Sequence, residues 1–111
     1  MTALDEADYE ARALPELRAL VDAFDAVELD GVEAELASDI LSLEFSDGDK
    51  YVVNSHRAAR QIWMAAGRTA WHFDWEPERS AWVAHKTGDE LWATLRRVVS
   101  EKLGREVKLS R

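Results

Sequence analysis

The sequence contains no cysteine, which excludes disulfide bonds, thiolate metal sites and thiol nucleophiles together. It has no apolar run near the roughly 20 residues that a transmembrane helix requires, so we expect no membrane span. The first residues, Met1–Glu6, lack the basic and apolar regions of a signal peptide and are too acidic for an organellar transit peptide. A chain without cysteine suits a reducing compartment, and we therefore expect a cytoplasmic protein.

Recognisable catalytic motifs are also missing. The chain has no phosphate-binding loop, dinucleotide fingerprint, zinc-ligand spacing or nucleophile elbow. Its three histidines, His56, His72 and His85, do not have the spacing of a local ligand set or a triad, and we expect surface positions for them. With 47% hydrophobic and 32% charged residues, the composition is that of an ordinary globular chain, and we expect one domain over residues 1–111.

Positive charge is scarce in the first half of the chain. Residues 1–49 hold fifteen acidic residues against Arg12 and Arg18, a balance of −13, whereas residues 50–111 hold seven acidic and twelve basic residues, a balance of +5. The formal net charge of −8 is therefore local. Such a surface repels nucleic acid and attracts cations or a basic partner. The alternative is an acidic helix that only aids solubility.

The N-terminal region has the pattern of an amphipathic helix. Its apolar residues recur at helical spacing: Leu14, Leu17, Val21 and Phe24. Pro15 is tolerated in a first turn but is costly inside a helix. Either the main helix begins near Leu14, or an earlier helix from Leu4 is kinked at the proline.

From Val32 onward the apolar residues alternate with polar ones, which predicts strands. The expected strands cover 32–36, 41–45, 51–53, the residues around Trp63, 71–75 and the residues around Trp82. Ser46–Asp49 has the chemistry of a hairpin turn, and residues 55–60 are expected to form a loop or a short helical turn. Alternation places these side chains on the buried face of the sheet: Ile62, Met64, Trp71, Phe73 and Trp75.

A second helix is predicted after residue 90. Thr87–Glu90 has the sequence of a capping box. An apolar stripe follows and ends before Gly104, a suitable C-terminal cap: Leu91, Leu95, Val98 or Val99, and Leu103. The predicted class is therefore α+β, an antiparallel sheet of about six strands covered on one face by the N- and C-terminal helices. The other face is left to water or to a partner.

Acidic residues around the end of the first helix and the first strand form a candidate cation site. They are Asp22, Asp25, Glu28, Asp30, Glu33 and Glu35. Exposed carboxylates suit hard cations such as Fe²⁺, Mn²⁺ or Ca²⁺. Because no imidazole or thiolate accompanies them, we expect weak binding of several ions.

A second candidate site lies on the open face of the sheet. Alternation points Gln61 and Trp63 outward, with Asn54 and His72 expected beside them. An exposed tryptophan among polar side chains is typical of a protein–protein hot spot. A slip of one residue in the strand register would instead bury Trp63.

At these positions the sequence resembles the frataxin family, including its bacterial, CyaY-type members. The resemblance rests on five segments and extends from about Leu4 to Leu109: Val53–Asn54, Gln61–Ile62–Trp63, His72–Phe73–Asp74–Trp75, Trp82–Val83 and the terminal helix. The Gln-Ile-Trp segment followed by Phe-Asp-Trp is specific to that family. The chain departs from the family pattern at His56, Ala58, Arg18 and Ala26, and at Pro15 in a helix that is continuous in the family.

The resemblance implies a small bacterial, cytoplasmic protein of iron–sulfur cluster assembly with an α–β-sheet–α sandwich. It implies weak binding of iron (Fe²⁺ or Fe³⁺) on an acidic ridge formed by the six carboxylates above. It also implies docking on the cysteine desulfurase and the scaffold protein through Asn54, Gln61, Trp63 and His72. We expect a monomer, with iron-dependent oligomers as an alternative. The alternative functions are a ferroxidase or iron-storage enzyme and a metal-independent interaction module.

Overall fold

The chain folds in the order helix, seven strands, helix in the computed structural model, which describes residues 5–110. The elements are α1 Glu6–Val27, β1 Val32–Ala37, β2 Ile40–Phe45, β3 Lys50–His56, β4 Gln61–Ala66, β5 Thr69–Glu76, β6 Ala81–Ala84, β7 Asp89–Glu90 and α2 Leu91–Leu103. The strands form one sheet in sequence order, and each neighbouring pair is antiparallel. No helix in this part of the chain is both long and apolar enough to span a membrane.

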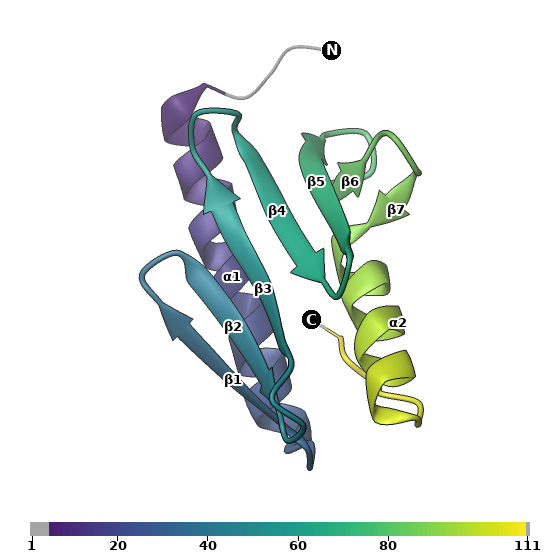
Figure 1. The fold of residues 1–111 in the computed structure, drawn as a ribbon. Helices are drawn as coiled ribbons and strands as arrows, with labels where there is room; N and C mark the ends of the chain where they lie inside the picture. The colour runs from purple at the N-terminus through teal and green to yellow at the C-terminus, as the bar shows by residue number, and fades with distance from the viewer. Residues whose placement is uncertain (1–4, 111) are drawn as a thin grey trace.

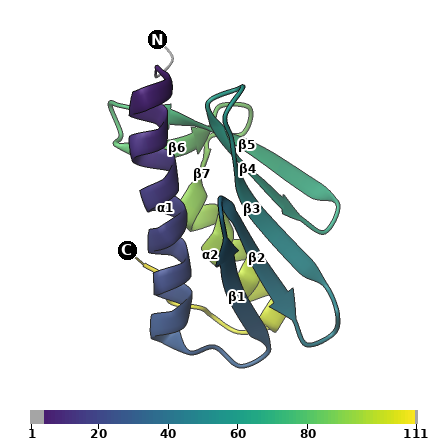
Figure 2. The ribbon, with the colours of Figure 1, turned by 90° about the vertical axis from the view of Figure 1, so that its left-hand side faces the viewer.

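Both helices cover the same face of the sheet. In Figure 1 the sheet lies in front of α1, and Figure 2 shows α1 on one side of the strands from the edge. Helix α1 contacts β1, β2 and β3, whereas α2 contacts β6 and β7. The predicted α+β sandwich is therefore confirmed, with β7 as a short strand beyond the expected six.

Helix α1 begins well before Pro15 and continues through it. The Asp5 side chain caps the helix by accepting a hydrogen bond from the Asp8 amide at 2.8 Å. The start near Leu14 is therefore wrong, and the earlier helix is correct, although Leu4 itself lies outside the described residues. Since proline has no amide proton, the turn before Pro15 lacks one helical hydrogen bond, and the packing of the buried face holds the helix across it.

The buried face of α1 begins earlier than the predicted stripe. Tyr9, Ala13 and Leu20 are buried beside the expected Leu17 and Phe24. The prediction for Leu14 is wrong, because its side chain is 40% exposed. The buried apolar residues of α1 centre on a direction about 110° from Leu14 at the helical rotation of about 100° per residue, so position 14 falls beyond the edge of the stripe.

Side chains in the central strands alternate as predicted. Ile62 and Met64 of β4 are buried at 0% and 1% exposure, and Phe73 of β5 is buried at 0%. Trp71 is also buried, and Trp75 is half-buried against the same core. The core therefore lies between the sheet and the two helices, and the opposite side of β3, β4 and β5 is open.

The cap of α2 differs from the predicted capping box. The N-cap is Glu90, whose carboxylate accepts hydrogen bonds from the amides of Trp92 and Ala93 at 2.9 and 3.0 Å. The Thr87 hydroxyl instead accepts from the Asp89 amide at 3.3 Å. The prediction fails because residues 89 and 90 pair with β6 as β7, so the backbone is still extended there. Gly104, with a φ of 71°, ends the helix as expected.

The two helices meet at a buried polar contact, and the segment that follows α2 is also buried in the core. Trp92 Nε1 donates to Glu16 Oε2 at 2.6 Å, and both side chains are buried. Beyond Gly104, Val107 and Leu109 are buried at 1% and 0% exposure. No burial was predicted for this segment.

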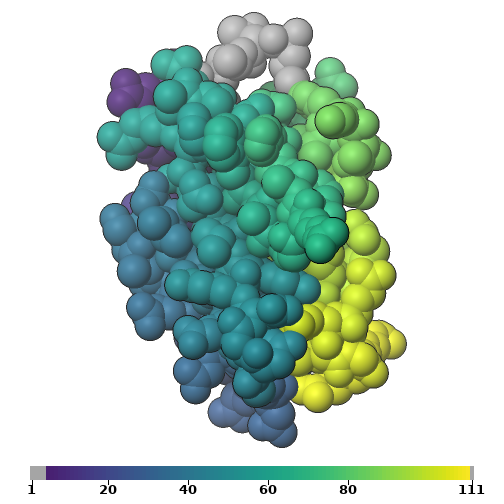
Figure 3. Space-filling view, in the orientation of Figure 1, coloured from purple at the N-terminus to yellow at the C-terminus, as the bar shows by residue number. Residues whose placement is uncertain are grey.

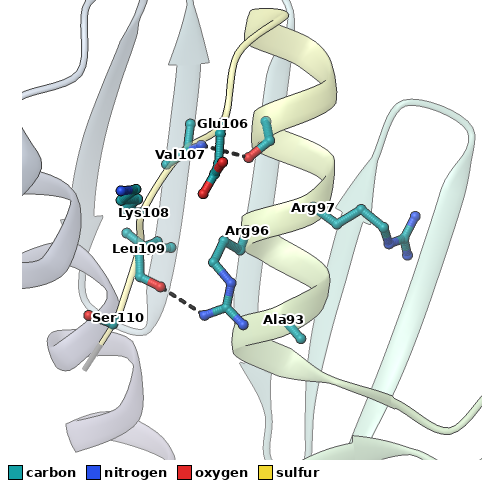
Figure 4. Close-up of a pocket in the computed structure, with 9 residues that line it drawn as sticks. Ala93, Arg96, Arg97, Glu106, Val107, Lys108, Leu109 and Ser110 are labelled. Carbon is teal, nitrogen blue, oxygen red and sulfur yellow. Dashed lines mark hydrogen bonds between the residues drawn. The ribbon is translucent and has the colours of Figure 1, made fainter.

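Two hydrogen bonds fasten the segment after α2, and Figure 4 shows both. Arg96 Nη1 donates to the Leu109 carbonyl oxygen, and the Val107 amide donates to Ser100 Oγ, each at 2.9 Å. The surface between α2 and this segment forms an open hollow of about 430 Å³. The segment is therefore a packed part of the structure.

Replacing Leu109 by alanine tests this packing. We expect Leu109→Ala to lower the free energy of unfolding by about 2–4 kcal/mol, because a fully buried leucine is truncated. The neighbouring Lys108→Ala, at an exposed position, is the matched control and is expected to change stability by less than about 0.5 kcal/mol. Urea unfolding followed by circular dichroism measures both. Equal effects of the two substitutions would contradict a core role for Leu109.

Candidate functional site

The open face of the sheet brings the four predicted docking residues together. In the strand register Asn54 is directly opposite Trp63, and Trp63 is directly opposite His72. Gln61 is two residues before Trp63 on β4 and therefore points to the same face. The prediction that Trp63 points away from the core is confirmed, since its side chain is half-buried while Ile62 and Met64 are buried.

The Trp63 ring is stacked between two imidazoles. The ring centroids of His56 and Trp63 are 3.7 Å apart with an interplanar angle of 13°, and those of Trp63 and His72 are 4.2 Å apart at 16°. Asn54, His56, Gln61, Trp63 and His72 are called the indole cluster below. Because both faces of the indole are covered, its orientation is fixed without a partner.

His56 was not among the predicted docking residues. The sequence pattern ends the third strand at Val53, whereas β3 continues to His56. Continuing the alternation through residues 54, 55 and 56 would have placed His56 on the same face as Asn54. The turn expected over residues 55–60 covers residues 57–60 in the structure. Within it, the Ala59 amide donates a hydrogen bond to His56 Nδ1 at 3.2 Å.

Hydrogen bonds fix the edge of the indole cluster as well. Trp63 Nε1 donates to Gln61 Oε1 at 2.8 Å, and Gln61 Nε2 donates to Asp74 Oδ1 at 3.1 Å. From the core side, the Tyr9 hydroxyl donates to the Gln61 carbonyl oxygen at 2.7 Å. Burial raises the pKa of the Tyr9 phenol, so this group keeps its proton at neutral pH and remains a donor.

The six predicted acidic residues are all exposed, and they follow the end of α1, the connection to β1 and β1 itself. Asp22, Asp25, Glu28, Asp30, Glu33 and Glu35 are called the acidic edge below. The chain turns from α1 into β1 through Glu28 and Gly31, whose φ angles are 47° and 90°. A side chain at position 31 would come within 3.3 Å of Leu103 Cδ2, so glycine also permits this close approach.

Two shallow hollows divide the acidic edge. One, of about 370 Å³, is lined by Asp25, Glu28 and Glu33. The other, of about 440 Å³, is lined by Asp30, Glu33 and Glu44. Glu33 borders both hollows, whereas Asp22 and Glu35 border neither. Glu44 was missed, although an antiparallel pairing of the first two predicted strands would have placed it opposite Glu33.

The acidic edge has no preformed chelating site. Within residues 5–110, no three histidine, aspartate or glutamate side chains come close enough to hold a metal ion. Its side chains are exposed and supply only oxygen ligands, which fits weak binding of hard cations. Two other acids nearby, Asp47 and Asp49, are paired with Lys102 of α2, and this ammonium group lowers the pKa of Asp47.

The two candidate sites are connected through the sheet. Figure 3 shows the open face, with the blue hairpin of β1 and β2 at the lower left beside the teal strands that carry the indole cluster. Glu33 and Glu35 project from β1, and Trp63 projects from β4, three strand positions away. Through the register Trp63 is level with Ala37 at the end of β1, so Glu35 is two residues and Glu33 four residues away along that strand.

Comparison with known proteins identifies the family. The sequence model of the frataxin-like domain matches residues 2–105. The iron–sulfur cluster assembly protein CyaY of Thioalkalivibrio sulfidiphilus is 38% identical over 86 residues, which cover 78% of each chain. The protein of the same name from Cupriavidus pinatubonensis is 34% identical over 113 residues, covering 98% of this chain and 99% of the relative.

Solved structures share the fold. Frataxin from Psychromonas ingrahamii superposes with a TM-score of 0.87 at 18% sequence identity, covering 97% of this chain and all of the other. Yeast frataxin superposes with a TM-score of 0.72 at 24% identity, covering 91% of this chain and 85% of the other. These likenesses show the fold, and the sequence matches show that the chain belongs to the frataxin family and is of the bacterial, CyaY type.

Proposed function

We propose that this protein acts in iron–sulfur cluster assembly, as a regulator or iron donor that docks on the cysteine desulfurase–scaffold complex in the bacterial cytoplasm. The role in assembly is supported by relatives that are named as CyaY proteins of that process. The proposal depends most on one observation, the half-buried, outward-facing indole that is fixed between His56 and His72 on the open face of the sheet.

The indole cluster has the physical properties of a docking site. Tryptophan contributes a large apolar area to an interface and is enriched among hot-spot residues. Here the ring already has stacked neighbours and a hydrogen-bonded nitrogen, so a partner does not have to order it on binding. A preorganised side chain loses less conformational entropy on association, and this improves affinity.

The acidic edge supports weak binding of iron as cargo. Carboxylate oxygens are suitable ligands for Fe²⁺ and Fe³⁺, and neighbouring negative charges attract the ion over a distance. Because these side chains are exposed and do not enclose an ion, exchange with a partner would not require a buried site to open. The same charges also suit a basic surface on the partner protein.

An oxidase function has less support in the geometry. Di-iron oxidase centres in helical bundles use carboxylates and histidines that project into a buried core. Of the carboxylates in residues 5–110, only Glu16 is buried, and it accepts a hydrogen bond from Trp92. No histidine belongs to the acidic edge or lines its two hollows. The described residues therefore favour binding and delivery over oxidation.

Charge reversal within one hollow tests the iron site. We expect the double substitution Asp25→Lys and Glu33→Lys to weaken Fe²⁺ binding about tenfold, because two ligands of one hollow are replaced by cations. Anaerobic calorimetric titration measures the affinity. The control, Glu101→Lys with Glu106→Lys, makes the same change in net charge at exposed positions after the sheet. An equal loss in the control would show that only net charge matters.

Truncation of the indole tests the docking surface. We expect Trp63→Ala to weaken binding to the purified cysteine desulfurase–scaffold complex by at least about tenfold, the range of an interface hot spot. Fe²⁺ binding should be unchanged, because Trp63 supplies no carboxylate and lines neither hollow of the acidic edge. Arg68→Ala, at an exposed position after β4, is the control and should bind like the wild type. Wild-type affinity of Trp63→Ala in surface plasmon resonance would refute docking through this face.

A further inference from the structure

His85 lies between two carboxylates beside the indole cluster. Its Nε2 atom is 2.8 Å from Glu76 Oε2, and its Nδ1 atom is 3.5 Å from Asp74 Oδ2. Both acids belong to β5, whereas His85 follows β6, so the contacts join two neighbouring strands. The imidazole is about half exposed, at 48%, so the ring is in contact with solvent.

Asp74 connects this histidine to the indole cluster. Its second oxygen, Oδ1, accepts from Gln61 Nε2 at 3.1 Å, and Gln61 Oε1 accepts from Trp63 Nε1 at 2.8 Å. An unbroken series of polar contacts therefore runs from Glu76 through His85, Asp74 and Gln61 to the indole nitrogen. It approaches Trp63 along the plane of the ring, whose faces are covered by His56 and His72.

The Asp74 carboxylate determines which way the Gln61 amide points. A carboxylate only accepts hydrogen bonds, so it must face the amide nitrogen of Gln61. The amide oxygen then faces the indole, whose nitrogen only donates. If the amide turned over, its nitrogen would meet the Trp63 N–H, and two donors would face each other. The orientation of the indole contact is thus set by a residue outside the indole cluster.

The protonation state of His85 determines whether Asp74 can accept a hydrogen bond from His85 as well as from Gln61. A neutral imidazole has a single N–H group and can donate to only one of its two carboxylate neighbours. With the proton on Nε2, which makes the shorter contact, the lone pair of Nδ1 faces Asp74 Oδ2 without a proton between them. A second proton allows donation to both acids. Histidine is the side chain that changes charge between pH 5 and 8.

We propose that His85 and Asp74 are positioning residues for Trp63, so that protonation of His85 strengthens the contact between Gln61 and the indole nitrogen and thereby strengthens docking. The effect on docking rests on the proposed docking function, whereas the effect of His85 on the indole contact can be measured in the free protein. The charged neighbours of His85 are Asp74 and Glu76 on β5 and Lys86 next to it in the chain. The titratable groups that face the indole are His56 from β3 and His72 from β5.

Nuclear magnetic resonance of the free protein tests the coupling. The indole ¹H–¹⁵N signal of Trp63 is followed from pH 8 to pH 5, together with the ring signals of His85. We expect the indole signal to show a step at the midpoint of the His85 titration. His85→Gln should remove this step. Asp74→Asn should also remove it, because asparagine can still accept from Gln61 but has no charge to attract the imidazolium.

His56 and His72 stack on Trp63, and a second background separates their effects on the indole signal from that of His85. His56 and His72 are replaced by glutamine, which leaves His85 as the one histidine of the chain's three. The step at the His85 midpoint should persist in this background and disappear when His85 is replaced too. An indole signal without a step at that midpoint, in the wild type or in this background, would overturn the proposal.

Docking is then measured at pH 6 and pH 8 against the purified desulfurase–scaffold complex. The gain in affinity at pH 6 over pH 8 should be about threefold larger for the wild type than for His85→Gln, the effect of roughly one net hydrogen bond. Equal ratios would refute the link to docking. If Trp63→Ala binds like the wild type, the docking function fails, but the titration of the free protein still decides whether His85 positions the indole.

Discussion

The strand register of β3, β4 and β5 is the constraint on which both faces of the molecule depend. Side chains alternate along each strand, so the register that buries Ile62 and Phe73 beneath the helices also aligns Asn54, Trp63 and His72 on the open side. A shift by one residue would exchange the two sets. The apolar core therefore stabilises the arrangement of the indole cluster, although none of the cluster's residues belongs to the core.

Contacts through the sheet reinforce this register at the start of β4. The Tyr9 hydroxyl, from helix α1, bonds to the backbone of Gln61, while the side chain of Gln61 on the open face holds the indole. The Ser55 hydroxyl donates to Asp39 and ties the β1–β2 turn to β3. The surface proposed for docking thus has its backbone fixed from the helical side and its side chains fixed by one another.

Local patterns in the sequence were enough to predict the layers of the fold and most of the candidate site. Alternation identified the outward position of Trp63, and charge counting located the acidic edge. Contacts that depend on pairing between distant segments were not visible in this way. The stack of His56 on Trp63, and the place of Glu44 opposite Glu33, both require the register of a hairpin.

The errors at the helix ends have the same origin. The capping box at Thr87 satisfies the local rule, but residues 89 and 90 pair with β6 and delay the helix. The exposure of Leu14 follows from packing against the sheet, which buries Tyr9, Ala13 and Leu20 and turns position 14 away. Local propensity therefore described the elements, whereas tertiary pairing decided their boundaries.

The sandwich of imidazole, indole and imidazole also restricts what the open face can recognise. Nucleobases and aromatic ligands usually bind a tryptophan by lying flat against it, which requires a free π-surface. Both surfaces of Trp63 are occupied by side chains of its own chain. A visiting molecule meets the rim of the indole and the outer sides of the two imidazoles, so a planar ring cannot stack on Trp63 itself.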